Sequence, residues 1–188
     1  MQDYSEHLAS TLKHLRKENG WSLDRTSKET GVSKAMLGQI ERGESSPTVA
    51  TLWKIAGGFK CSLSSFIASD IKNNDEVLLR SSERLRSQPC EGEMLVATLF
   101  PFDAKKGFEM FELTLPPDYE RISEPHEPGV TEHIVVTSGK MELLLNDSWR
   151  ELKSGDVVQF DASKPHGYRN RSGQNAVFHD VIHYLSIK

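Results

Sequence analysis

The chain has 188 residues, of which 27% are charged and 37% are hydrophobic, and its formal net charge is −4 at pH 7. This balance is typical of a globular protein and excludes a largely disordered chain. No stretch approaches the ~18 uninterrupted apolar residues of a membrane helix, and the acidic N-terminal residues do not resemble a signal peptide. Two cysteines do not make a disulfide framework, so we expect a cytoplasmic protein.

The first third of the sequence has the pattern of short helices joined by tight turns. Leucines recur at helical spacing near the start, serines precede two further segments as N-caps, and glycines follow those segments as C-caps. A proline opens a fourth helix that carries a broad apolar stripe. The predicted helices are one through Leu8, Leu12 and Leu15, then 23–30, 34–42, one that begins at Pro47-Thr48, and 62–67.

The polar run 69–75 is the predicted linker, and the pattern changes after it. Short apolar segments alternate with Gly, Pro, Asp and Asn, as in an all-β barrel or sandwich. We therefore expect a helical domain over 1–68, with a net charge of +2, and a β-domain over 76–188. The predicted strands are 77–79, 94–100, 108–115, 133–136, 141–145, 157–160 and 176–183.

A helix-turn-helix is predicted between the second and third helices. Their connection, 30–33, places Gly31 where a tight turn requires a positive φ. Leu37 and Ile40 then face the core, and the outer face of the third helix is left to Lys34, Ala35, Gly38 and Gln39. Glutamine pairs with adenine and lysine with guanine acceptors, whereas small residues let a helix lie close in the groove. The alternative is a helical packing module in which Gln39 is merely solvated.

The stretches 20–23, 30–43 and 46–56 resemble the Cro and phage-repressor (XRE) family of DNA-binding domains, a five-helix, lambda-repressor-like fold. The resemblance implies that 34–42 is the recognition helix and that a salt bridge joins Arg16 to Glu41. It also implies a phosphate contact near Ser22 and Arg25. Thr26-Ser27 and Gly38 depart from the family pattern. The candidate DNA-binding residues are Ser22, Arg25, Ser33, Lys34, Ala35, Gly38, Gln39, Ser45, Ser46 and Thr48.

A second group of candidate residues, His126, Glu132 and His166, lies in the β-domain. Residues 126 and 132 are an even number of positions apart, so one strand would direct both side chains to the same face. His166 is expected on a later strand that closes against the first. Two imidazoles and one carboxylate are a common ligand set for a divalent transition metal with open coordination positions.

The β-domain resembles the cupin family, an all-β barrel also called a double-stranded β-helix. Carried over by motif, His126, Glu132 and His166 are metal ligands, and Gly139 and Asn170 are further motif residues. Pro128 stands where the family has its second histidine. The resemblance therefore implies a divalent metal ion, with zinc as the first expectation, held by three of the family's four ligands.

The order of the two modules resembles the XRE–cupin transcriptional regulators. The expected protein is an α+β multidomain regulator that binds a palindromic DNA operator as a homodimer. A membrane is not among its expected partners. Its cupin domain is expected to sense a small metabolite that is amino-acid-like, with a sulfur-containing one as the narrower expectation. The alternatives are a metal-dependent cupin enzyme with an accessory DNA-binding domain, and a DNA-binding protein whose barrel only dimerises.

Overall fold

The computed structural model describes residues 2–67, 81–87 and 94–184. The chain divides into two compact units, Met1–Leu78 and Leu79–Lys188. The predicted linker 69–75 and the predicted strand 77–79 lie outside the described residues. Among the described helices, none is long and apolar enough to cross a membrane.

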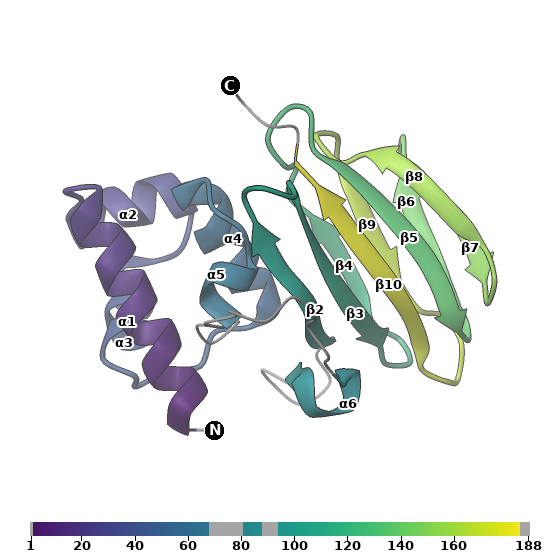
Figure 1. Cartoon of the computed structure of the whole chain (residues 1–188), viewed down its shortest axis with the longest axis horizontal. Helices are drawn as coiled ribbons and strands as arrows, with labels where there is room; N and C mark the ends of the chain where they lie inside the picture. The colour runs from purple at the N-terminus through teal and green to yellow at the C-terminus, as the bar shows by residue number, and fades with distance from the viewer. Residues whose placement is uncertain (1, 68–80, 88–93, 185–188) are drawn as a thin grey trace. The chain divides into compact units, whose positions relative to one another are not determined.

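The first unit contains the five helices that the sequence predicts (Figure 1). Its core is built from the apolar positions of the helical repeat, which include Leu8, Leu12, Leu37, Leu52 and Ile55, each at most 2% exposed. These helices are α1 (Gln2–Glu18), α2 (Leu23–Thr30), α3 (Lys34–Glu41), α4 (Val49–Phe59) and α5 (Ser64–Ile67).

Hydroxyl side chains begin three of these helices. Ser22, Ser33 and Thr48 each have extended backbone and accept a hydrogen bond from the backbone N–H three residues later. Each side chain satisfies a donor that the first turn of a helix leaves without a partner. Gly31 ends α2 with a φ of 67°, as the helix-turn-helix pattern predicts.

A close approach of α4 to α2 depends on Gly58. A Cβ at this position would lie 2.8 Å from the carbonyl oxygen of Glu29 and 2.8 Å from the Cα of Thr30. Both atoms belong to the backbone, so neither can move aside cheaply. The adjacent Gly57 has no heavy atom within 4 Å of the same hypothetical Cβ.

The second unit is an antiparallel β-structure of two sheets. The six-stranded sheet has the order β1-β2-β3-β10-β5-β8, and the four-stranded sheet has the order β4-β9-β6-β7. Figure 1 shows β3, β10 and β5 side by side, with β4, β9 and β6 of the other sheet behind them. The elements are α6 (Ser82–Leu85), β1 (Arg86–Ser87), β2 (Leu95–Asp103), β3 (Phe108–Leu115), β4 (Glu120–Ser123), β5 (Thr131–Ser138), β6 (Lys140–Leu145), β7 (Ser148–Lys153), β8 (Val157–Asp161), β9 (His166–Arg169) and β10 (Ala176–His183).

The strands β1, β4 and β7 were not predicted from the sequence, and β9 was expected only as a strand that carries His166. These strands are two to six residues long and carry polar or charged residues at most positions, so no apolar run marks them. Backbone pairing with neighbouring strands, rather than an apolar pattern, makes these segments strands. For example, β9 pairs with both β4 and β6.

The strand β10 contributes a row of buried side chains to the interior of this unit. Its side chains alternate between buried and half-buried positions, which places Phe178, Asp180 and Ile182 on the inner face. It pairs with β3 on one side and β5 on the other, so Ile182 lies between Glu109 and Glu132. An inner face of this composition is apolar at most positions and acidic at a few.

Gly58→Ala is expected to destabilise the helical unit by about 1–3 kcal/mol, because the added methyl group overlaps the backbone of α2. Gly57→Ala is the matched control. It should stabilise the unit by about 0.5–1 kcal/mol, since alanine restricts the unfolded chain and favours the helix. Urea denaturation of the full chain measures both changes, and equal effects of the two substitutions would contradict the close approach of α2 and α4.

Candidate functional site

The outer face of α3 carries three of the four residues predicted there. Lys34, Ala35 and Gln39 are exposed. Gly38 is buried, and a Cβ at this position would lie 3.2 Å from the Nη1 atom of Arg42 and 3.8 Å from Leu23. The expectation that Gly38 lies on the outer face was therefore wrong, because side chains from within the unit cover it. Met36, which the sequence analysis did not select, is 37% exposed on the same helix.

The predicted hydroxyl contacts fall into two groups. Ser22, Ser33 and Thr48 are helix N-caps, so their oxygens already accept a backbone hydrogen bond, and the hydroxyl of Thr48 also lies 3.0 Å from that of Thr51. Ser46 is exposed and Ser45 is half-buried in the segment between α3 and α4. Helix N-termini and hydroxyl groups are common phosphate contacts.

The two predicted cationic contacts take part in exposed ion pairs. Lys34 lies 2.8 Å from Asp24, and Arg25 lies 2.6 Å from Glu29. Exposed pairs of this kind contribute little to stability. Both cations therefore remain available to an incoming phosphate or base at small cost.

An ion pair between Arg16 and Glu41 fixes α3 against α1. The guanidinium bonds both carboxylate oxygens, with Nε–Oε1 at 2.5 Å and Nη2–Oε2 at 2.9 Å, and it also donates to the carbonyl of Trp21 at 3.0 Å. Hydrogen bonding to Glu41 raises the pKa of Arg16. The two side chains are 16% and 9% exposed. The salt bridge implied by the family resemblance is present, and it lies at the end of the predicted recognition helix.

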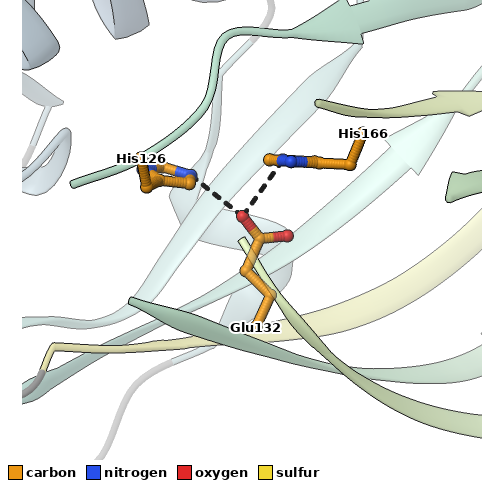
Figure 2. A group of neighbouring side chains, drawn as sticks. All are labelled: His126, Glu132 and His166. Atoms are coloured by element: carbon orange, nitrogen blue, oxygen red, sulfur yellow. Dashed lines mark ion pairs between the residues drawn. The ribbon is translucent and has the colours of Figure 1, made fainter. Parts of the chain in front are cut away.

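In the second unit, His126, Glu132 and His166 come together (Figure 2). The Nε2 atoms of His126 and His166 lie 2.9 Å and 3.4 Å from the same oxygen, Oε1 of Glu132. Glu132 and His166 are on β5 and β9, as expected, and both are 1% exposed. His126 is instead in the loop before β5, so the expectation of one strand directing both residues was wrong. The loop reaches the site because the backbone N–H of His126 bonds the carbonyl of Ala162.

The protonation of His166 is constrained by its second nitrogen. Nδ1 lies 2.9 Å from the carbonyl oxygen of Lys164, which only accepts, so Nδ1 carries a hydrogen. In the neutral ring, Nε2 then presents a lone pair toward the Glu132 carboxylate. Nε2 is buried and makes no hydrogen bond within the described residues. A proton or a metal ion between Nε2 of His166 and the Glu132 carboxylate removes the repulsion between the lone pair and the anion. A histidine whose other ring nitrogen donates to a carbonyl group is typical of metal sites.

Charge and burial oppose each other at this cluster. Burial works against ionisation of Glu132, but the neighbouring imidazoles of His126 and His166 outweigh that effect and hold the pKa of Glu132 well below its usual range. Burial lowers the pKa of His166, and interaction with Glu132 outweighs that effect and raises it. The cluster thus holds an anionic carboxylate between imidazoles, which suits a cation.

Two motif residues of the predicted cupin domain have structural roles. Asn170 is fully buried and donates to the carbonyls of Leu115 and Gln174. Gly139 has a φ of 72°, and a Cβ there would lie 2.5 Å from the carbonyl oxygen of Asn175. Pro128 is exposed in the turn between His126 and β5.

Further polar residues in the interior were not selected from the sequence. Glu109, Asp180 and Arg121 are at most 8% exposed, and the hydroxyl of Tyr184 donates to Glu109 at 2.5 Å. Tyr168 donates its hydroxyl to the second oxygen of Glu132. Burial raises the pKa of Asp180 well above its usual value, with repulsion from Glu132 and Glu109. The alternation of 176–183 was a usable signal, because it places Asp180 on the same face as Phe178 and Ile182.

Known families match both units. A model for helix-turn-helix domains matches residues 12–66, and a model for cupin domains matches residues 111–182. The HTH-type transcriptional regulator SutR from Escherichia coli K12 is 44% identical over 184 residues, which is 98% of each chain. The chain therefore belongs to the XRE-type helix-turn-helix transcriptional regulators with a cupin domain.

A solved structure that matches nearly the whole chain agrees with this assignment. The crystal structure of an HTH_3 family transcriptional regulator from Vibrio cholerae is 45% identical, covers 97% of each chain and has a TM-score of 0.80. The cupin domain of an XRE family transcriptional regulator from Enterobacter cloacae is 43% identical over 49% of this chain and 97% of that one, with a TM-score of 0.48. The predicted order, a helical DNA-binding domain and then a cupin domain, is confirmed.

Arg16→Ala is expected to lower stability by about 2–3 kcal/mol, because it leaves Glu41 nearly buried without its partner. The value lies below that of a fully buried pair, since water still reaches both side chains. Arg42→Ala removes an exposed partner of Glu44 and should leave the melting temperature almost unchanged. Equal melting temperatures for wild type and Arg16→Ala would show that this pair does not hold α1 to α3.

Proposed function

We propose that this DNA-binding transcriptional regulator is ligand-responsive. In this proposal the helix-turn-helix domains of a homodimer bind a palindromic operator in the cytoplasm, and the cupin domain senses a small metabolite. The observation that carries the proposal is the buried cluster of His126, Glu132 and His166 in a domain joined to a DNA-binding domain. A domain that only joined two subunits would not need three ionisable side chains converging in its interior.

The DNA-binding half of the proposal rests on the exposed face of α3. Gln39 and Lys34 offer hydrogen-bond donors to base edges, and Ala35 keeps the face shallow. One helix of this length covers only a half-site. Two copies separated by one turn of DNA, ~34 Å, would bind a palindrome, and this is the reason to propose a homodimer.

The sensing half rests on the donor set in the barrel. His126, Glu132 and His166 fit a divalent ion, for which we propose zinc, because the neutral His166 ring aims a lone pair at an anionic carboxylate. Such an ion would supply positive charge and coordination positions open to a ligand. We propose an amino-acid-like effector for those positions, because its amino nitrogen and carboxylate oxygen chelate two adjacent sites. A sulfur-containing metabolite remains the narrower form of this proposal.

The residues around the cluster favour sensing over catalysis. An enzyme needs an acid or base beside the reacting group. Tyr168 donates its hydroxyl to Glu132 and is buried, so it acts as a support of the carboxylate. SutR, which matches nearly the whole chain, is named as a transcriptional regulator.

Gln39→Ala is expected to lose discrimination at one position of each half-site, by ~1–3 kcal/mol per half-site. Ser46→Ala, the control, should weaken binding by a similar factor on every sequence, since a phosphate contact carries no base information. Selection from a random DNA library followed by anisotropy titration measures both effects. An unchanged sequence preference in Gln39→Ala would contradict the assignment of the α3 face.

The metal proposal is tested by elemental analysis of protein purified from cells. Wild type is expected to carry about one divalent ion per chain, and Glu132→Ala none, because it removes the only carboxylate of the donor set. The same variant should lose the response to effector yet keep basal DNA affinity. Asp161→Asn, an exposed acidic position, is the control and should keep its metal. Absence of metal from both proteins would leave a metal-free pocket and refute this part of the proposal.

A further inference from the structure

Asp180 is a buried carboxyl group without a donor. It lies on the inner face of β10 and is 1% exposed, and its Oδ1 makes no hydrogen bond within the described residues. Such a group has lost its water without gaining a partner, which is costly in a protein interior. The positions before and after it on the same face, Phe178 and Ile182, are fully buried and apolar. An apolar residue would fit this position without that cost.

The neighbours of Asp180 increase its need for a positive charge. Ile182 pairs with Glu109 on β3 and with Glu132 on β5, and Asp180 stands two positions along the same face, diagonal to both acids. Each acid has a hydroxyl donor, from Tyr184 and Tyr168 respectively. Asp180 has none among the described residues.

One cation, Arg121 on β4, is also buried in this interior, and its charge acts on His166 and Tyr168. Among the described residues, neither Arg121 nor any other donor forms a hydrogen bond with Oδ1 of Asp180. The carboxyl groups of Glu109 and Glu132 lie diagonal to Asp180 on the same inner face.

We propose that Asp180, with Glu109 beside it, binds a protonated amino group of the effector. This inference rests on the proposed sensing function and narrows the ligand to one class. The ligand is a small metabolite with chelating groups at one end, for the cluster at Glu132, and a primary ammonium at the other. An ammonium supplies three donors and the missing positive charge. A thioether or alkyl end supplies neither, so the inference disfavours a methionine-like ligand.

The test uses full-length, metal-loaded protein and four probes: L-ornithine, L-lysine, L-norleucine and L-methionine. Norleucine and methionine match ornithine in length but end in a methyl group. We expect ornithine or lysine to bind at least tenfold more tightly than both, by calorimetry, and to raise the melting temperature. Equal or tighter binding of the methyl-ended probes, or no binding of any probe, would overturn the proposal.

Substitutions at Asp180 identify the group responsible. Asp180→Asn keeps the shape, loses no hydrogen bond, and should reduce the affinity for the ammonium probe at least tenfold while leaving that for norleucine unchanged. Asp118→Asn removes an exposed carboxylate from the same domain and should change neither. Asp180→Asn with unchanged selectivity overturns the assignment.

Two further measurements separate this inference from the proposed function. Asp180→Leu should raise the melting temperature of the ligand-free protein, because it replaces a buried polar group whose Oδ1 has no hydrogen bond among the described residues. A fall instead would mean that Asp180 is a structural group, against the proposal. Metal content should be the same in wild type and Asp180→Asn. If probe selectivity holds but no probe alters DNA binding, the sensing function fails while the ammonium site stands.

Discussion

One carboxylate, Glu132, holds the interior of the cupin domain together. It receives His126 from a loop, His166 and Tyr168 from a strand of the opposite sheet, and it stands beside the central strand β10. A buried anion is tolerated only when it is paired and hydrogen-bonded, so these partners are the condition for its presence. A change of charge at Glu132 would therefore alter contacts in both sheets.

In the helical unit, the outer face of α3 stays exposed and polar while the helices are fixed against one another. The Arg16–Glu41 pair and the close contact at Gly58 hold α3 and α4 without using the exposed face of α3. Binding energy from DNA is then not needed to order the recognition helix. The two units thus differ in kind: the helical unit presents preformed contacts on an exposed face, and the β-unit gathers charged side chains in its interior.

Local signals explain what the sequence predicted well. Caps such as Ser22 and turn glycines such as Gly31 act within a few residues, so the helix-turn-helix was readable to within a residue or two. The strands β1, β4 and β7 were missed because their pairing partners, not their own residues, decide their structure. Tertiary contacts also explain two errors, since Leu23 and Arg42 cover Gly38, and a loop rather than a strand delivers His126. The buried acids Glu109 and Asp180 were invisible to motif searching, because no family pattern names them.

The central place of β10 has a consequence for how the chain acquires its structure. Its neighbours β3 and β5 precede it by tens of residues, and Phe108 pairs with His183, so the six-stranded sheet is completed only by contacts distant in sequence. In the helical unit, the contacts of Arg16 with Glu41 and of Gly58 with Glu29 span fewer residues than these strand pairings do. Because folding rates fall as contacting residues grow more distant, the helices are expected to form first and the barrel to close later. During synthesis, the helical DNA-binding domain is therefore expected to fold before the cupin domain does.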